Sequence, residues 1–429
     1  MPDIVDGVMG DELVVLCVSF LQCSEFIKNP YLKASLVSLL FYGTWEFQRG
    51  RAGILVPFLK GSKFANNYLL HALLKFYIEC ESTGMHTQFY DKFNIRYEIF
   101  QVIKTVWDMP AYHRQLTRES ETNRAFFVRF VNLLLNDATY VLDEALSKFP
   151  RIHTLEFELK GGQLSQEDKQ KKEEELQRLA DQATSYMQLA NETLAMMKLF
   201  TKALLQPFTM PEIVQRLASM LNYNLSTLAG PKCNNLKVDN AEKYHFRPRE
   251  LLSDFVDIYN NLGSSQAFVE AVATDGRSYS PQVFEKAAMI AQNRTSKDPA
   301  ELQAFNALRT QFQQAYIIAM QAEMDLGEIP DEFEDPISAE LMKDPVLLPS
   351  KQIVDRSTIS QHLLSDPMDP FTRQPMTIDD VIPDVDLKAR IDAWKAERIA
   401  AAAQAALAGQ DSGGGGGGGG GDLMDTSEG

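Results

Sequence analysis

The chain has 429 residues and a formal net charge of −16, from 42 basic and 58 acidic side chains. This length suits two to four domains or one long repeat array, since a domain takes about 100–200 residues. The acidic balance argues against a nucleic-acid backbone or an anionic membrane surface as partner, because both are bound by clustered Lys and Arg.

The cysteines are too few and too irregularly spaced for a disulfide framework. They are Cys17, Cys23, Cys80 and Cys233. The first apolar run, Leu13 to Leu21, is too short to span a bilayer and follows acidic residues, unlike a signal peptide. We therefore expect an intracellular protein in a reducing compartment, without membrane insertion.

Residues 1 to about 328 carry one amphipathic helical pattern after another. A helix is predicted to begin at Pro30 and to place four leucines on one face, namely Leu32, Leu36, Leu39 and Leu40. An apolar stripe from Phe126 to Phe149 predicts another helix, which we expect Pro150 to end. Many helices with short breaks predict a mainly α fold, either an α-solenoid or an irregular bundle.

The stretch Gln163–Leu179 is almost wholly polar. It predicts a solvent-exposed helix held in part by ion pairs between residues four apart, and a protein-docking helix is the alternative.

A compact segment rich in Pro and Asp follows, from residue 329 to about 400. Its Asp-Pro dipeptides favour turns and loops. Between them we expect a short strand at Val346–Leu348 and a helix at Ser357–Leu364, which begins at Asp355 or Ser357. A second helix is predicted from Val385 or Asp386 into the alanine run near residue 400. The segment therefore predicts a small, loop-rich α/β module.

Nine consecutive glycines, Gly413–Gly421, predict a disordered linker within residues 401–429. The acidic end that follows is interpreted as a solvated tail. The alternative is a docking peptide switched by phosphorylation of Thr426 or Ser427.

Most catalytic signatures are absent from the sequence, including a glycine-rich phosphate loop, a His-Glu-x-x-His pair and a Gly-x-Ser-x-Gly elbow. The six histidines stand apart from one another and are interpreted as structural or surface residues. Cys80 lies between Glu79 and Glu81, which disfavours a reactive thiolate, and Cys233 is only a slightly better candidate nucleophile.

The Asp- and Pro-rich segment resembles a U-box across about 70 residues, with its landmarks in order. The matching positions are residues 330–350, 354–359, 362–364, 369–375, 382–383 and 387–391, and Trp394. A U-box is similar to a RING finger without zinc. Two zinc sites need eight Cys or His ligands, whereas residues 331–398 contain no cysteine and one histidine. We therefore expect no metal and no other cofactor.

Hydrogen bonds and ion pairs are expected to replace zinc in holding the two long loops. The candidate stabilising residues are Asp355, Arg356 and Asp369, together with Ser357, Thr372 and nearby backbone amides. Direct contact with a partner is the alternative for Asp355 and Asp369.

The resemblance implies a ubiquitin ligase that binds a ubiquitin-charged conjugating enzyme in a shallow apolar groove. By position, Ile337 and Pro370 would contact that enzyme, and Phe371, Thr372 and Leu364 are further candidates. For the apolar residues, filling the core of the module is the alternative.

By the same resemblance, Arg373 would touch the conjugating enzyme and its thioester-linked ubiquitin together. A guanidinium suits such bridging because its donors form a fixed fork. The effect would be positional, favouring attack-ready conformers of the charged ubiquitin, with no covalent intermediate on this chain. An ion pair of Arg373 with Asp369 is the alternative.

The helical region resembles the core of ubiquitin chain-elongation factors of the Ufd-two type. The matching segments are residues 26–34, 133–138, 142–145, 246–251 and 275–279. The resemblance implies an armadillo-like helical array at residues 1–328, followed by the U-box at 329–400, with this chain corresponding to the C-terminal part of the usual family length. It also implies a cytoplasmic and nuclear protein that acts on ubiquitinated substrates with the valosin-containing AAA ATPase segregase.

Two rival hypotheses stay open. The chain could be a non-catalytic helical adaptor with an inactive U-box, or a ligase that forms its own thioester at Cys80 or Cys233.

Overall fold

The computed structural model describes residues 11–23, 25–46, 52–82, 89–161, 165–326 and 328–411. The chain divides into two compact units, Met1–Tyr316 and Ile317–Gly429. The predicted poly-glycine linker and acidic end lie outside the described residues.

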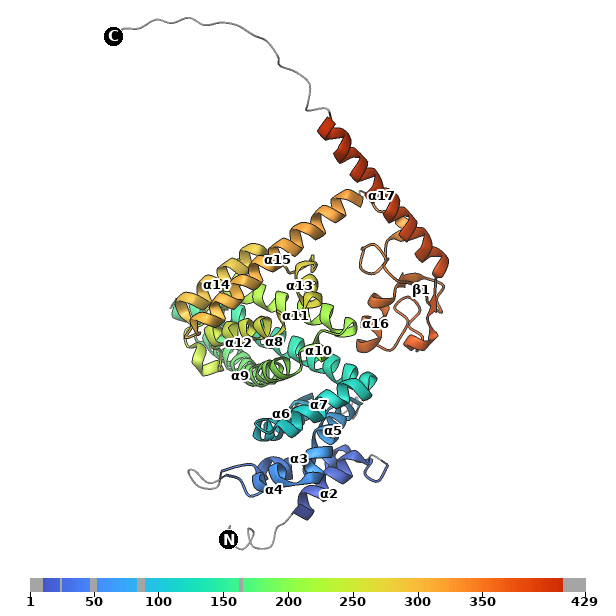
Figure 1. Cartoon of the computed structure of the whole chain (residues 1–429). Coiled ribbons are helices and arrows are strands. Elements are labelled where there is room, and N and C mark those ends of the chain that lie inside the picture. The colour runs from blue at the N-terminus through green and yellow to red at the C-terminus, as the bar shows by residue number, and fades with distance from the viewer. Residues whose placement is uncertain are drawn as a thin grey trace, which may run out of the picture. The chain divides into compact units, whose positions relative to one another are not determined.

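The first unit is built from helices in close succession, coloured from blue to orange in Figure 1. They are α2 (Asp11–Gln22), α3 (Pro30–Gly43), α4 (Val56–Gly61), α5 (Lys63–Glu79), α6 (Phe89–Val106), α7 (Pro110–Thr122), α8 (Arg124–Lys160), α9 (Gln166–Ala203), α10 (Leu205–Phe208), α11 (Pro211–Ala229), α12 (Pro248–Leu262), α13 (Gln266–Ala273), α14 (Pro281–Arg294) and α15 (Pro299–Leu326). Short 3₁₀ helices stand at η1 (Cys80–Ser82), η2 (Pro231–Leu236) and η3 (Ala241–Tyr244). The predicted mainly α fold is confirmed.

Contacts between these helices stay local in chain order. Helix α8 packs along α9, α2 along α5, α3 along α6 and α11 along α13. Such short-range packing is typical of stacked helical arrays, in which each element is stabilised mainly by its neighbours. One continuous apolar core runs through the unit from α2 to α15.

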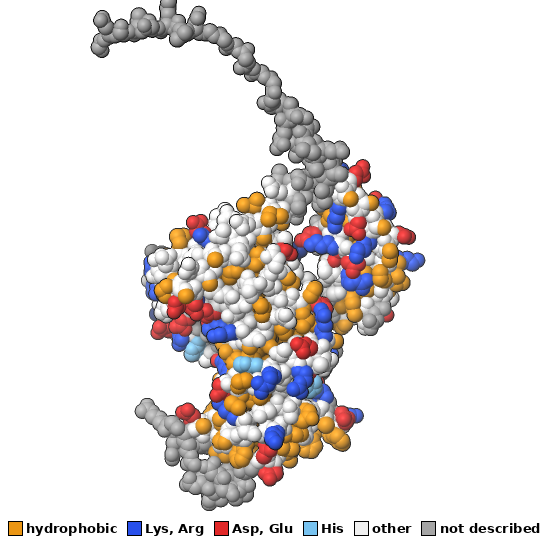
Figure 2. All heavy atoms as spheres, in the orientation of Figure 1, with side chains coloured by type: hydrophobic (Ala, Val, Ile, Leu, Met, Phe, Trp, Pro, Cys, Tyr) orange, Lys and Arg blue, Asp and Glu red, His pale blue; other side chains and the backbone are white. Residues whose placement is uncertain are grey.

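Helix α3 begins as predicted, with Pro30 in its first turn and the Asn29 side chain accepting a hydrogen bond from the Tyr31 amide. The prediction of its apolar face is wrong in part, because the side chains of Leu32 and Leu39 are exposed. The buried apolar residues of the helix are Val37, Leu40 and Phe41. Hydrophobic side chains are accordingly visible on the surface of the N-terminal helices in Figure 2.

Helix α8 continues through Pro150 to Lys160, so the prediction that Pro150 ends this helix was wrong. Proline removes one backbone hydrogen bond and costs a helix interior about 3 kcal/mol. Here the apolar stripe resumes on the next turn, where Ile152 and Leu155 are buried. Pro150 itself is exposed. The packing gained beyond Pro150 offsets the missing bond.

Helix α9 begins at Gln166, after Ser165 caps it by accepting a hydrogen bond from the Asp168 amide. Its first turns are solvent-exposed and carry ion pairs between residues four apart, Lys171 with Glu167 at 2.7 Å and Lys169 with Glu173 at 3.8 Å. The prediction of a solvated, ion-paired helix is confirmed for this part. The remainder of α9 packs along α8 and buries one face of the helix.

One helix of the described part, α8, is long and apolar enough to cross a membrane by length and composition alone. More than half of its most apolar window is buried inside the protein, at 56%. Packing against neighbouring helices therefore accounts for this apolar content.

The second unit contains the last turns of α15, a small antiparallel sheet and two further helices. The strands β1 (Pro345–Leu347), β2 (Ile353–Asp355) and β3 (Ile382–Pro383) lie in the order β2-β1-β3. The helices are α16 (Arg356–Ser365) and α17 (Val385–Asp411), with 3₁₀ turns at η4 (Asp331–Phe333) and η5 (Ile378–Asp380). The predicted strand and both predicted helices are present, and Asp355 is the residue that caps α16.

Two small apolar clusters form the core of this unit. One joins the sheet to α16 through Val346, Leu348, Val354, Ile359, Met376 and Val381. The other joins η4 to α17 through Phe333, Met342, Leu387 and Ile391, with Trp394 packed against Phe333 at 5.8 Å between ring centres.

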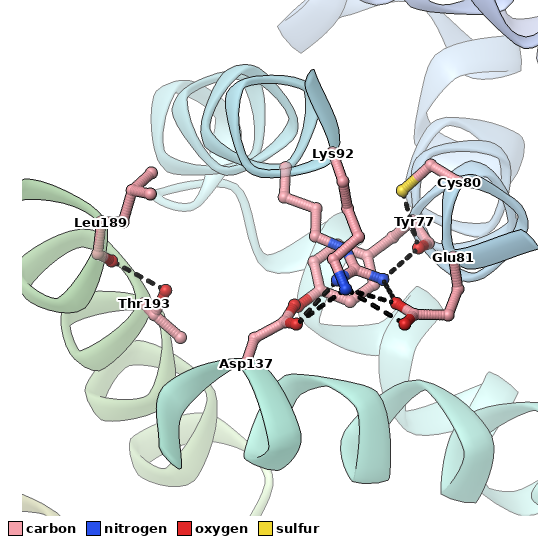
Figure 3. A network of polar contacts seen from close by, with 8 residues as sticks. Tyr77, Cys80, Glu81, Lys92, Asp137, Leu189 and Thr193 are labelled. Carbon is pink, nitrogen blue, oxygen red and sulfur yellow. Dashed lines mark hydrogen bonds and ion pairs between the residues drawn. The ribbon is translucent and has the colours of Figure 1, made fainter. Parts of the chain in front are cut away.

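A buried polar network joins α5, α6 and α8 in the first unit (Figure 3). Arg96, only 2% exposed, donates to Asp137 at 2.7 Å, to Glu81 at 2.7 Å and to the Tyr77 carbonyl at 3.1 Å. The Tyr77 hydroxyl donates to the other oxygen of Asp137, and Lys92 pairs with Glu81 at 2.9 Å. Each buried charge thus has an oppositely charged partner, which is the condition for tolerating it in an apolar core.

Asp137→Ala should lower the free energy of unfolding by about 3–5 kcal/mol, because it leaves Arg96 charged and buried without its main partner. Glu212→Ala is the matched control, since the ion pair of Glu212 with Arg124 is exposed on both sides. That control should cost about 0–1 kcal/mol. Urea unfolding followed by circular dichroism measures both variants. Similar losses for the two would contradict the role assigned to Asp137.

Candidate functional site

The first loop of the C-terminal unit, residues 334–341, is folded around the buried carboxylate of Asp335. One carboxylate oxygen accepts hydrogen bonds from the amides of Ile337 at 2.8 Å and Ser338 at 3.4 Å. The other oxygen accepts from the Asp355 amide at 2.8 Å. Asp335 therefore shapes the loop and ties it to strand β2.

The second loop, residues 368–375, is folded in the same way around Asp369, which is 1% exposed. One carboxylate oxygen accepts from the amides of Phe371 at 2.9 Å and Thr372 at 3.1 Å. The other accepts from the Ser350 amide, at 3.1 Å, in the turn between β1 and β2. Asp369 thus ties the second loop to the opposite end of the same hairpin.

The backbone of the two loops repeats this correspondence. In each, the aspartate amide donates to the carbonyl five residues later, Glu340 at 2.8 Å or Gln374 at 2.9 Å. Its carbonyl accepts from the amide four residues later, Ala339 or Arg373, at 2.8 Å in both. Both of these residues adopt the left-handed region, with φ of 57° and 58°. The loops are therefore two copies of one turn.

Asp355 links the segment that follows the first loop to helix α16. One of its oxygens accepts from the amides of Lys343 at 2.6 Å and Asp344 at 2.8 Å. The other accepts from the amide and the hydroxyl of Ser357, at 2.9 and 2.6 Å, and so caps α16. Arg356 donates to the Asp344 carboxylate at 2.7 Å. The hydrogen bonds and ion pairs expected in place of zinc are present at these positions.

These hydrogen bonds favour the ionised form of both buried carboxylates. Burial alone would raise the pKa of Asp355, but the bonds from Ser357, Asp344 and Lys343 outweigh burial and lower that pKa. The pKa of Asp369 is likewise lowered, because the hydrogen bonds that it accepts from Phe371, Thr372 and Ser350 outweigh the effect of burial.

Apart from Leu364, the residues expected to contact a conjugating enzyme lie on these two loops. Ile337 and Phe371 occupy equivalent positions, two residues after the aspartate, and are 41% and 43% exposed. Thr372 and Arg373 are also exposed, whereas Pro370 is half-buried. The alternative that Ile337 and Phe371 fill the core is not what the structure shows, since neither belongs to the apolar clusters of the unit.

Helix α16 supports the second loop. The Nε2 of His362 donates to the Met368 carbonyl at 2.9 Å, so this histidine has the structural role expected of it. Leu364, the remaining predicted contact, lies in the last turn of α16, and its side chain is outside the described residues.

The structure gives little support to a thioester intermediate at Cys80 or Cys233, the alternative left open by the sequence. Cys80 is 1% exposed, and burial raises the pKa of its thiol, which disfavours a nucleophilic thiolate. Cys233 is half-buried, with its sulfur 3.3 Å from the Lys286 amine. In the part of the chain that the structure describes, no group of three His, Cys, Asp or Glu side chains could hold a metal ion.

Sequence reasoning missed Asp335, the counterpart of Asp369. The signal was present, because Asp-Pro-Ile-Ser-Ala-Glu at residues 335–340 and Asp-Pro-Phe-Thr-Arg-Gln at residues 369–374 share one pattern. An Asp whose side chain accepts from amides two and three residues later is the usual basis of such a turn.

The stability of this unit should fall in acid. Because the folded-state pKa of Asp355 and Asp369 is depressed, their contribution is present above the unfolded value of about 3.9 and is lost as pH falls below it. Asp355→Asn should lower the free energy of unfolding by about 1.5–3 kcal/mol at neutral pH. It should also reduce the fall in stability that the unit shows as the pH is lowered into the acid range. Hydrogen exchange of the Lys343 and Asp344 amides, corrected for intrinsic rates, measures the effect. Asp392→Asn, an exposed site on α17, is the control, and an unchanged fall in stability in acid for Asp355→Asn would refute the assignment.

Comparison with known proteins agrees with this geometry. The ubiquitin elongating factor core model matches residues 1–313, and the U-box domain model matches residues 329–399. The chain is 48% identical over 386 residues to ubiquitin conjugation factor E4 of Schizosaccharomyces pombe, covering 89% of this chain and 38% of that protein. It is 39% identical over 389 residues to E4 ubiquitin-protein ligase UFD2 of Saccharomyces cerevisiae, covering 88% and 40%.

A plant relative is similar over the same part. The chain is 39% identical over 404 residues to the probable ubiquitin conjugation factor E4 of Arabidopsis thaliana, covering 91% of this chain and 38% of that protein. The chain therefore spans about two fifths of the length of these relatives. From the match of its first 313 residues and of the module that follows, the chain belongs to the ubiquitin elongating factor core family and carries a U-box domain.

Proposed function

We propose that this chain is a U-box ubiquitin ligase that acts as a chain-elongation factor. It binds a ubiquitin-charged conjugating enzyme and promotes transfer of ubiquitin to a substrate or to a growing chain, without a covalent intermediate of its own. The observation that carries the proposal is the pair of Asp-clamped loops, which hold Ile337, Phe371 and Arg373 exposed on a stiff frame. The names of the relatives, a conjugation factor and a ubiquitin-protein ligase, support it.

The proposed roles follow from the chemistry of each side chain. Exposed apolar residues on hydrogen-bonded loops favour binding of a protein partner. Little conformational entropy is lost in ordering such loops, and burial of the Ile337 and Phe371 side chains against the partner is favourable. Arg373 can bridge two carbonyl groups with its forked donors. Fixing ubiquitin against the conjugating enzyme raises the fraction of attack-ready conformers.

The wider setting is part of the same proposal. Its substrates already carry ubiquitin, the helical unit is the scaffold that receives them, and the valosin-containing AAA ATPase segregase is the partner that delivers or receives them. The protein acts in the cytoplasm and the nucleus. The rival functions are a helical adaptor without activity and a ligase that uses Cys233 as a nucleophile.

Arg373→Ala should slow ubiquitin discharge from a charged conjugating enzyme by about tenfold or more at saturating ligase, while folding is retained. Single-turnover discharge onto free lysine, with a panel of conjugating enzymes, measures it. Discharge by the unaltered chain at the uncatalysed rate with every conjugating enzyme would support the adaptor instead.

Cys233→Ser should leave the rate of discharge unchanged in the same assay. Loss of activity in this variant would support a thioester intermediate on this chain.

Ile337→Ala should weaken binding of the conjugating enzyme by about tenfold, the loss expected for a partly buried aliphatic contact of about 1.4 kcal/mol. Ile382→Ala is the matched control, because Ile382 is 63% exposed on β3, outside both loops. Its affinity should stay within about twofold of the unaltered chain. Equal affinities in a calorimetric titration of both variants would remove Ile337 from the binding surface.

A further inference from the structure

The two clamped loops differ in one chemically important position. Each contains a residue with a left-handed backbone four residues after its aspartate, and this residue is Ala339 in the first loop and Arg373 in the second. For an L-residue this conformation costs about 1–2 kcal/mol, so it persists only where surrounding contacts impose it. Those contacts come from the aspartate four residues earlier. Its carbonyl accepts from the amide of the left-handed residue. Its carboxylate accepts from the amides two and three residues after it, and so fixes the chain that leads into the left-handed residue.

The carboxylate of Asp369 is occupied by backbone donors. Its oxygens accept from the amides of Phe371, Thr372 and Ser350. Among the residues that the structure describes, the ion pairs of this unit join Arg356 and Lys388 with Asp344, and Arg390 with Glu332. None of them involves Arg373, which is exposed. The alternative ion pair between Arg373 and Asp369 is therefore not formed. The clamp shapes the loop without neutralising the guanidinium beside it.

We propose that Asp369 is a positioning residue for Arg373: by holding the amides of Phe371, Thr372 and Ser350, it imposes the left-handed backbone at Arg373 and so sets the direction in which the guanidinium leaves the loop. This inference rests on the proposed function, in which Arg373 bridges the conjugating enzyme and ubiquitin. It adds that the reach of Arg373 depends on a buried carboxylate that touches neither partner.

The first loop supplies a matched control within the same domain. Asp335 has the same set of acceptor contacts and is equally buried, at 0% exposed against 1% for Asp369. Its left-handed residue is Ala339, which has no charged side chain to aim. A purely structural role predicts similar consequences for Asp335→Asn and Asp369→Asn. A positioning role predicts that only Asp369→Asn is coupled to Arg373.

The test is a double-mutant cycle on single-turnover discharge by the full chain, at saturating conjugating enzyme. In the unaltered background and in Asp335→Asn, Arg373→Ala should slow discharge by about tenfold. In Asp369→Asn it should slow discharge by less than about twofold, because the guanidinium is already misdirected. Hydrogen exchange of the Phe371, Thr372 and Arg373 amides should accelerate in Asp369→Asn and not in Asp335→Asn.

A second variant changes the backbone and keeps both side chains. Gln374→Pro disfavours a helical or left-handed backbone at Arg373, because the residue before proline is pushed to extended conformations. Gln374 is exposed, so the substitution removes no buried side chain. Discharge should slow by about fivefold or more, with Asp369 and Arg373 both present. This variant keeps the inference testable if Asp369→Asn unfolds the domain.

Three results would overturn the inference. They are a full effect of Arg373→Ala in Asp369→Asn, equal coupling in the Asp335→Asn background, and an unaltered rate in Gln374→Pro. Absence of discharge by the unaltered chain would instead defeat the proposed function, and the positioning role with it. If Arg373→Ala slows discharge of the ubiquitin-charged conjugating enzyme but shows no coupling to Asp369→Asn, the proposed function stands and only the positioning role is refuted.

Discussion

Buried carboxylates that accept backbone hydrogen bonds determine the structure of the C-terminal unit. A small domain with two long loops must satisfy loop amides that no sheet or helix can pair. Asp335, Asp355 and Asp369 meet this requirement with two oxygens each, and nearly all of their donors are backbone amides. Because Asp335 receives the amide of Asp355, the first loop and the cap of α16 form one connected network.

The helical unit is stabilised by apolar packing and not by buried carboxylates in loops. Its stability comes mainly from apolar packing between neighbouring helices, so a single change is felt chiefly by adjacent elements. The network around Arg96 and Asp137 is an exception, since it fixes the register of α5, α6 and α8 through directional contacts. Apolar stacking allows many registers, whereas a buried ion pair allows few.

The sequence predicted element types better than element faces and ends. Helical periodicity marked the first unit, yet Leu32 and Leu39 are exposed and α8 continues past Pro150. Both errors arise from tertiary packing, which decides the buried face of an apolar helix and can outweigh a local helix breaker. The ordered landmarks of the U-box located Ile337, Phe371 and Arg373 on two loops. Asp335 was missed because the short pattern that it shares with Asp369 does not by itself reveal a common turn, which is evident from the matching hydrogen bonds of the two loops.

The absence of cysteine from residues 331–398 has a consequence for the conditions under which this domain can stay folded. Thiolate-zinc sites are open to oxidation, which removes ligands and releases the metal. Aspartate carboxylates and backbone amides have no comparable redox chemistry. The contacts of Asp335, Asp355 and Asp369 that hold the loops therefore contain no thiolate ligand whose oxidation would release them.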